Sequence, residues 1–164
     1  MTEVRQSVAV QLTKGETLYA VMVGGARQSA AARQGRRNDA ALRAADWQCH
    51  IEGALGELVV AKALGRYWAP NVGGYDYGAD VGRFEVRATS KPDGPLIVRD
   101  RDSDAAAYVL VTGTPPCLEI RGWLYGREAK QDRYRAAPAG RPPAYFVPPG
   151  ELHPFETLDD GRPF

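Results

Sequence analysis

The sequence predicts one α/β domain, built on a mixed β-sheet of four to six strands flanked by helices. Capping signals typical of two long helices fall before residue 65, and short β-rich runs separated by proline and glycine follow it. The length of 164 residues is enough to bury one hydrophobic core and suggests a single domain.

The composition argues against several classes of protein. Hydrophobic residues make up 44% of the chain and charged residues 25%, as in an average soluble domain, so global disorder or a fibrous repeat is not expected. No apolar run approaches the ~20 residues of a membrane span, and the first residues lack the pattern of a signal peptide. Cys49 and Cys117 form neither a metal-ligand spacing nor a disulfide framework. We therefore expect a reduced, cytoplasmic chain with no membrane partner.

Residues 1–45 are expected to form a strand and a basic helix that extend the domain. Val8 to Leu12 alternates like a short strand, and Thr13 with Glu16 has the capping-box spacing that begins a helix. That helix is expected to run from about Lys14 to Gln34 and to stop at Gly35. Five arginines gather on and after it: Arg27, Arg33, Arg36, Arg37 and Arg43. They indicate either a phosphate-binding surface or a solvated helix face.

A second helix is expected from Trp47 to Leu64, with Asp46 as its N-cap and Gly65 as its stop. At 100° per residue, Glu57 falls on a face of small and apolar side chains. An acid in such surroundings is costly unless it has a partner. Glu57 is therefore a candidate functional residue, and the alternative is a helix-surface acid at the rim of the core.

The chain after Gly65 is expected to be β-rich. The predicted strands, separated by prolines and glycines, are residues 80–89, 96–99, 108–112 and 117–124. The third is the most hydrophobic and is expected at the centre of the sheet. A short helix is predicted at 127–135. The proline-rich segment 126–164, which follows the core at 46–125, is expected to wrap the surface largely as extended chain.

The candidate chemistry lies between Asp80 and Arg87. Gly82-Arg83 has the composition of a two-residue type II′ hairpin turn, which would pair Asp80 with Glu85. Directly opposite side chains lie about 5 Å apart on one face of a sheet, so two carboxylates would face each other with Arg87 beside them. The intervening apolar residues, Val81, Phe84 and Val86, would face the other side.

Two like charges opposite each other destabilise a hairpin, so something should offset their repulsion. Arg87 could do so in part. A divalent cation, Mg²⁺ or Mn²⁺, would do it better, because Mg²⁺ prefers a few hard oxygen ligands plus water. The predicted ligands are Asp80, Glu85 and the backbone carbonyl of Val86. Glu57 could approach from the helix and hold a metal-bound water.

An acidic run follows the second predicted strand of this β-rich region. Asp100, Asp102 and Asp104 alternate as in half of a calcium-binding loop. The glycine and the final glutamate of that loop are missing, so we assign no calcium site to them.

The order of these residues resembles the PD-(D/E)xK nuclease superfamily. The matching pieces are Glu57 on a helix, then Asp80, then Glu85-Val86-Arg87 on a strand. The resemblance covers about residues 46–125 and implies a restriction-endonuclease-like core with an added N-terminal helix. Segments 108–111, 120–124 and 145–148 further resemble small phage or prophage proteins of this type.

The resemblance implies a metal-dependent nuclease that hydrolyses phosphodiester bonds of nucleic acid, DNA foremost. Asp80 and Glu85 would bind the metal, with Glu57 in its outer shell, and the metal would polarise the phosphate and activate water. The family has a lysine where this chain has Arg87. Arginine stays protonated and cannot act as a base, but it can clamp phosphate oxygens.

A second interpretation keeps the fold and drops the chemistry. The protein would then be a non-catalytic module that binds nucleic acid or protein, with Arg87 and its acids as a structural ion-pair cluster. A phage accessory protein that binds a phage or host protein is a third interpretation.

Overall fold

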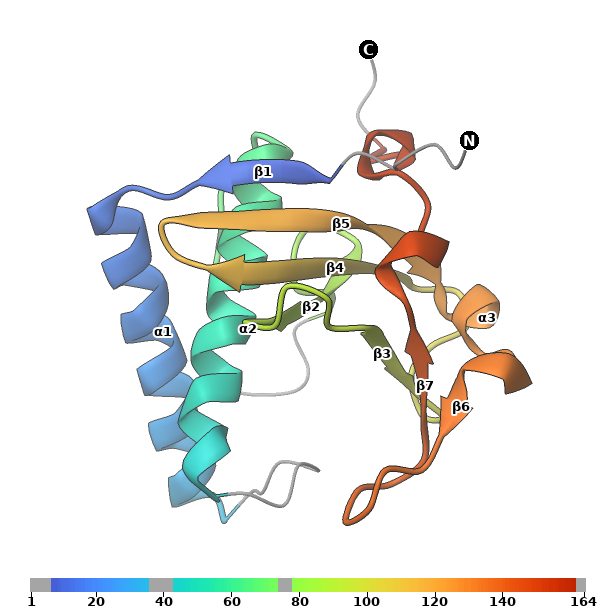
Figure 1. Ribbon diagram of the computed structural model, residues 1–164. Helices are drawn as coiled ribbons and strands as arrows, with labels where there is room; N and C mark the ends of the chain where they lie inside the picture. The colour runs from blue at the N-terminus through green and yellow to red at the C-terminus, as the bar shows by residue number, and fades with distance from the viewer. Residues whose placement is uncertain (1–6, 36–42, 74–77, 162–164) are drawn as a thin grey trace.

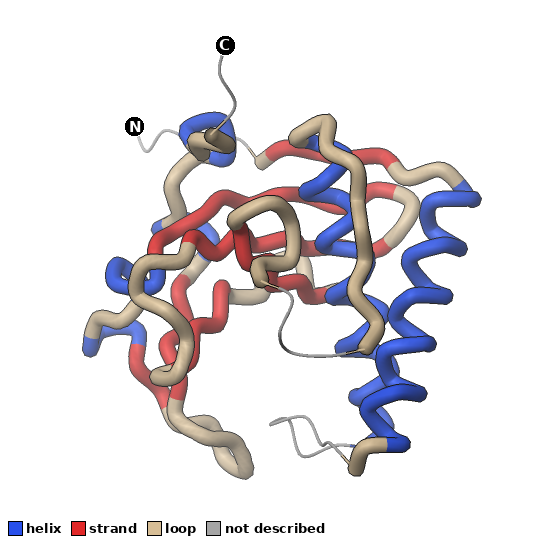
Figure 2. Tube along the Cα trace, turned by 180° about the vertical axis from the view of Figure 1, so that it is seen from behind, coloured by secondary structure: helices blue, strands red, loops and turns tan. Residues whose placement is uncertain are grey.

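Two antiparallel helices pack on one face of a mixed four-stranded sheet, and a smaller antiparallel sheet lies against the other face (Figure 1). Figure 1 is a computed structural model, and the structure describes residues 7–35, 43–73 and 78–161. Seen from behind, the two long helices lie together on the right, on the side away from the second sheet (Figure 2). The expected α/β class with a mixed sheet is confirmed, and the two long helices lie on one face of that sheet.

The elements are as follows. The helices are α1 (Lys14–Arg33), α2 (Arg43–Ala63) and the short α3 (Gly126–Ala129). The strands are β1 (Val8–Gln11), β2 (Phe84–Thr89), β3 (Leu96–Arg99), β4 (Ala107–Thr114), β5 (Cys117–Tyr125), β6 (Arg135–Ala136) and β7 (Ala144–Val147). Among the described residues, short 3-10 turns occupy 132–134, 149–151 and 155–157. None of the described helices offers an apolar stretch suited to crossing a bilayer.

The main sheet has the order β1-β5-β4-β2, with β2 parallel to β4 and the other pairs antiparallel. Residues 108–112 were expected to form the central strand, and the inner position of β4 confirms this. The first six residues of β4 are buried, as in a strand that is covered on both faces. The predicted strand 96–99 forms with the expected bounds, but it leaves this sheet. Its partner is β7, so the chain passes through a second sheet between β2 and β4.

The second sheet, with the order β3-β7-β6, corrects the expectation of a tail that merely wraps the surface. Tyr145 and Val147 of β7 are buried in a second core with Leu96 and Val98 of β3. The prolines of the tail flank this strand instead of interrupting it, so they leave its ladder hydrogen bonds intact. Tyr108 and Leu110 of β4 complete that core from the main sheet, on the face opposite the helices.

Helix α1 begins as predicted. The Glu16 N–H donates to Thr13 Oγ1 at 3.1 Å, and the Thr13 N–H donates to Glu16 Oε2 at 2.7 Å, so both halves of the capping box are present. Gly24 then lets α1 approach α2 closely, because a Cβ there would lie 2.6 Å from the Ile51 Cα atom. The segment expected as an extension is thus built into the body of the domain, with β1 as a strand of the main sheet.

Helix α2 begins earlier than predicted and ends where predicted. It starts at Arg43, so Asp46 lies in its first turn and is not its N-cap. The residues before Asp46 are good helix formers, which explains the early start. After Ala63, Gly65 adopts φ +60°, and the Arg66 N–H donates to the Ala61 carbonyl at 2.8 Å.

The predicted helix at 127–135 is wrong over most of its length. α3 makes a single turn and ends at Ala129, and a 3-10 turn follows at 132–134. The side chain of Lys130 reaches the turn after β3, where its ammonium donates to the Asp100 carbonyl at 3.0 Å. This contact ties the chain after α3 to the second sheet instead of letting the helix continue.

Candidate functional site

The predicted hairpin turn is present at the start of β2. Val81 and Phe84 exchange two backbone hydrogen bonds, of 3.1 and 2.9 Å, around Gly82. Gly82 has φ +60°, the left-handed conformation that a type II′ turn requires of its first central residue. The pairing stops after this one bridge, so the predicted strand 80–89 begins only at Phe84. β2 is consequently an edge strand of the main sheet, with β4 on its other side.

Asp80 lies against this open edge and meets Glu85 there. Asp80 Oδ2 accepts a hydrogen bond from the Val86 N–H at 2.8 Å. Glu85 is within hydrogen-bonding reach of the Asp80 carboxylate. Burial, followed by the nearby charge of Asp80, raises the pKa of Glu85 to about 7. The predicted cross-strand pair of Asp80 and Glu85 does not form, because the hairpin pairing stops at the Val81–Phe84 bridge. The two acids are instead neighbours at the edge of the strand.

Arg87 lies beside the two acids as predicted. Its Nη1 atom is 3.8 Å from Glu85 Oε2 and donates to the Val86 carbonyl at 3.4 Å. Its Nη2 atom binds Asp102 Oδ2 at 3.1 Å, and its guanidinium carbon lies 5.0 Å from the centre of the Tyr108 ring. Its Nε atom is buried without a hydrogen-bond partner. Asp102 and the Tyr108 ring therefore hold the guanidinium in place.

Glu57 faces the interior of the molecule, as its helix position predicts, and both of its oxygens are engaged. Arg27 Nη1 and Nη2 bind Glu57 Oε1 and Oε2 at 2.6 and 2.9 Å. The indole N–H of Trp68 donates to Oε2 at 3.1 Å. Burial raises the pKa of Glu57, Arg27 pulls it in the opposite direction, and the charge of Asp80 adds to the rise. Glu57 thus lies within electrostatic range of the β2 edge, with its hydrogen bonds directed to Arg27 and Trp68.

The predicted basic surface does not include Arg27. The Arg27 side chain is only 15% exposed, and its Nε donates to the Asn71 carbonyl at 2.7 Å, so it supports the core instead of reaching solvent. Arg33 is exposed near the end of α1. Arg36 and Arg37 lie outside the described residues, as does the side chain of Arg43.

The acidic run 100–104 surrounds an internal cation. Lys130 Nζ donates to the carbonyls of Asp100 and Asp102 at 3.0 and 2.5 Å and to Asp104 Oδ1 at 2.6 Å. The Asp100 carboxylate binds Arg135 at 2.7 and 3.1 Å. Each of the three aspartates thus has a cationic side chain of its own.

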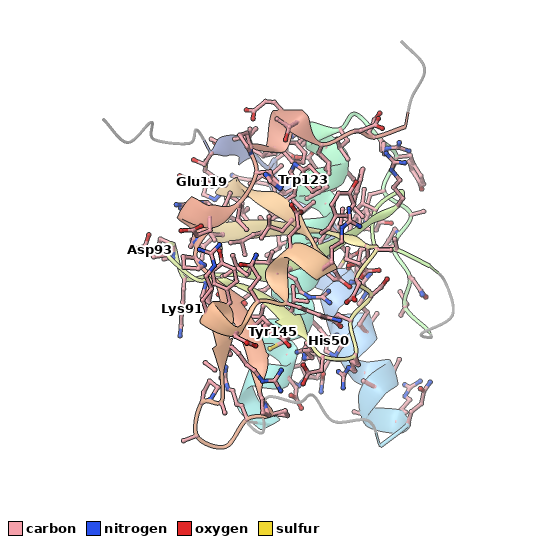
Figure 3. All side chains as sticks on the ribbon, turned by 90° about the vertical axis from the view of Figure 1, so that its right-hand side faces the viewer. His50, Lys91, Asp93, Glu119, Trp123 and Tyr145 are labelled. Atoms are coloured by element: carbon pink, nitrogen blue, oxygen red, sulfur yellow. The ribbon has the colours of Figure 1, made fainter. Side chains whose placement is uncertain are left out.

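Two neighbours of the site were not predicted. Asp102 and Tyr108 position Arg87. In the sequence, Asp102 belongs to the acidic run and Tyr108 to the predicted central strand, and neither pattern indicates a contact with Arg87. Lys91, the nearest lysine along the chain after Arg87, is exposed near the likewise exposed Asp93 on the turn before β3 (Figure 3).

The oxygen atoms at the β2 edge fit a hard cation such as Mg²⁺. Asp80 and Glu85 provide carboxylates, and the Val86 carbonyl is turned toward the same edge, where Arg87 meets it. Across the parts of the chain that the structure describes, no three His, Cys, Asp or Glu side chains gather closely enough to hold a metal ion. A cation here would therefore rely on two carboxylates, one carbonyl, and water or substrate oxygens, a set that Mg²⁺ commonly uses.

Comparisons with protein-family models, with curated proteins and with solved structures found no match to this chain.

Proposed function

We propose that the edge of β2 is the active site of a metal-dependent nuclease that hydrolyses phosphodiester bonds, with DNA as its foremost substrate. One observation carries the proposal: Asp80 and Glu85 converge beside the Val86 carbonyl, closely enough that burial and the Asp80 charge raise the pKa of Glu85 to about 7. A site that holds two carboxylates together is suited to a divalent cation. The restriction-endonuclease-like character of the core, with Glu57 on α2 close to Asp80, belongs to the same proposal.

Asp80, Glu85 and the Val86 carbonyl would hold Mg²⁺ or Mn²⁺. The bound ion would polarise the phosphate and lower the pKa of a water molecule. Because the ligands must be deprotonated, binding of the ion should displace the proton that Glu85 retains near neutral pH.

Arg87 has the role of binding the scissile phosphate. Arginine stays protonated, so it cannot accept a proton from water, but it can stabilise the charge that develops on phosphate oxygens. Asp102 and the Tyr108 ring fix its guanidinium. Its Nη1 contacts to Glu85 and Val86 are long, at 3.8 and 3.4 Å, so this donor could turn to an anion. Asp102 and Tyr108 are therefore positioning residues.

A second candidate function is a non-catalytic module that binds nucleic acid or protein on the same fold. The observation that favours it is the place of Arg87, whose guanidinium already touches the Glu85 carboxylate and the Val86 carbonyl. In this case Arg87 serves as the internal counter-ion of the acids. A phage or host protein is the partner proposed for the protein-binding form.

The experiment that separates these functions combines metal binding with cleavage. Calorimetry with Mg²⁺ and Mn²⁺, and incubation with single-stranded, double-stranded and branched DNA and with RNA, are carried out on the wild type and on Asp80→Asn. Asp93→Asn, an exposed aspartate on another turn, is the matched control. We expect Asp80→Asn alone to lose both metal binding and cleavage while keeping its melting temperature. If every substrate stays intact with Mn²⁺ and Asp80→Asn binds the ion like the wild type, the nuclease proposal is wrong.

A further inference from the structure

The outward face of α1 carries a patch of exposed apolar side chains, called the α1 patch below. Figure 1 shows α1 at the edge of the molecule, with α2 and the sheets on its other side. Five of the large hydrophobic side chains that are exposed in the described part of the chain lie on this face or beside it at the start of α2. They are Leu18, Tyr19, Val21, Met22 and Trp47, between 37% and 63% exposed. A cluster of this kind is typical of an interaction surface.

The α1 patch is uncharged. Arg27 is the only charged residue in the segment 17–32, and its guanidinium is directed into the pair with Glu57. A solvated helix face normally carries charged side chains, so exposure to water does not account for this composition. The surface that covers the patch should itself lack charge, because a charged group placed against it would lose its hydration without gaining a partner.

The centre of the patch is a row of residues that changes from large to small along the helix. Leu18, Met22, Gly25 and Ser29 follow one another at spacings of four, three and four residues, which align on one face. A second copy of α1 can lie antiparallel on this row, with the two-fold axis between Met22 and Gly25. Leu18 then lies opposite Ser29 of the copy, and Met22 opposite Gly25. Each large residue meets a small one, as in well-packed helix pairs, whereas a parallel pair would place large against large.

The area of the patch also suits a second copy. At their exposed fractions, its five side chains present roughly 500 Å² of surface, as much as the largest apolar patches of monomeric proteins. A two-fold interface uses the same patch twice, so a dimer would bury roughly 1,000 Å² of these side chains together. The small residues between them add to this area. The total reaches the size at which specific interfaces begin.

We propose that the protein forms a symmetric dimer through antiparallel α1 helices, with Met22 of each copy seated on Gly25 of the other. Gly25 allows this approach because it has no side chain, and the Trp47 ring borders the same place, since it would lie 3.8 Å from a Cβ at Gly25. Lys14 and Arg33, near the ends of α1, lie on opposite sides of the row, so the antiparallel arrangement keeps them apart. The inference is independent of the proposed nuclease function, because no residue of the α1 patch belongs to the β2 edge.

The test is the oligomeric state of the full chain, measured by analytical ultracentrifugation from about 1 to about 200 µM. Because the buried area is at the lower end of the range for specific interfaces, we expect monomers at the lowest concentration and dimers at the highest. Met22→Glu should weaken the dimer at least about tenfold, since each carboxylate would be buried in an uncharged interface. Ala137→Glu adds the same charge at an exposed residue outside the patch and should dimerise like the wild type. Melting temperatures verify that the variants are folded.

A second set of variants tests the antiparallel arrangement. Ser29→Leu places a large side chain opposite Leu18 of the other copy and should weaken the dimer about tenfold, because the two side chains overfill the space. Leu18→Ser should weaken it as well, through the loss of apolar contact. Leu18→Ser/Ser29→Leu should restore the dimer, since a large residue again meets a small one.

The inference is overturned if the chain stays monomeric at about 200 µM, or if Met22→Glu dimerises as well as Ala137→Glu. A dimer that Ser29→Leu strengthens, or that the double variant fails to restore, would refute the antiparallel arrangement. Flotation with vesicles of neutral phosphatidylcholine tests another occupant of an uncharged apolar face. Binding by a chain that stays monomeric, lost in Met22→Glu, would assign the patch to a lipid surface and overturn the dimer.

Discussion

The Arg27 guanidinium holds the Glu57 carboxylate by two parallel hydrogen bonds, of 2.6 and 2.9 Å, between α1 and α2. In the sequence these two residues belong to separate hypotheses, a basic surface and an acidic active-site residue. In the structure the two charges neutralise each other, and the side chains of Arg27 and Glu57 are only 15% and 8% exposed. The pair therefore ties α1 to α2.

The first prediction concerns this pair. Arg27→Ala leaves a buried carboxylate without its cation, which typically costs about 3–5 kcal/mol, and urea unfolding measures the loss. Arg33→Ala, an exposed arginine on the same helix, should change the free energy of unfolding by no more than about 0.5 kcal/mol. Arg27→Met/Glu57→Met should recover much of the loss, since it removes both charges. Equal stabilities of Arg27→Ala and Arg33→Ala would refute the structural role.

The second prediction concerns the contact between α1 and α2. A Cβ at Gly24 would lie 2.6 Å from the Ile51 Cα atom, and backbone atoms cannot move aside as a flexible side chain can. Gly24→Ala should therefore destabilise the protein by about 1–3 kcal/mol. At Gly25 the nearest atom to such a Cβ belongs to the Trp47 ring, at 3.8 Å. Gly25→Ala should be neutral or stabilise the helix by up to about 1 kcal/mol. Thermal melts compare the two, and the reverse order would contradict the packing described.

The third prediction is a dependence of stability on pH. The pKa of Glu85 is about 7 in the folded protein, above its ordinary value of 4.5. Between these values the folded state binds more protons than the unfolded state, so the stability of the metal-free protein should fall as the pH rises from 4.5 to about 7. Glu85→Gln should flatten this slope, and Glu156→Gln, an exposed control, should not.

The stabilisation of the protein by Mg²⁺ at different pH values tests the same carboxylate. Because Mg²⁺ requires deprotonated ligands, it should stabilise the wild type more above the pKa of Glu85 than below it. Denaturant titrations with and without Mg²⁺ at the two pH values measure the difference. Equal stabilisation at both, or none in the wild type, would favour the ion-pair cluster over the metal site.

The fourth prediction concerns the turn from Arg99 to Asp104, which the Lys130 side chain holds. Lys130→Met removes the ammonium from two carbonyls and the Asp104 carboxylate, and leaving such acceptors unsatisfied costs about 1–3 kcal/mol. Hydrogen exchange should show faster opening of the amides of residues 99–104. Lys91→Met, at an exposed lysine, is the control. Unchanged exchange in Lys130→Met would mean that the turn is held by other contacts.

Local signals in the sequence predicted much of the fold. The capping box at Thr13, the glycine stop at Gly65 and the turn at Gly82 each depend on residues a few positions apart, and all three formed. The strand at 96–99 was predicted with its observed bounds, but its partner was not, because β7 lies far along the chain in a segment that its prolines mark as broken. The α2 start was missed because helix formers precede Asp46 without a stop signal.

The sequence by itself determined which charged residues meet over a short stretch of chain. The turn at Gly82 brings Asp80 close to Glu85, and Arg87 follows two residues later on the same strand. Only the tertiary structure decided which charges find one another across the fold, pairing Arg27 with Glu57, Asp102 with Arg87, and Lys130 with the acidic turn. The physical reason is that a buried charge must find a counter-charge wherever packing brings one near, and packing depends on the register and stacking of sheets and helices rather than on spacing along the chain.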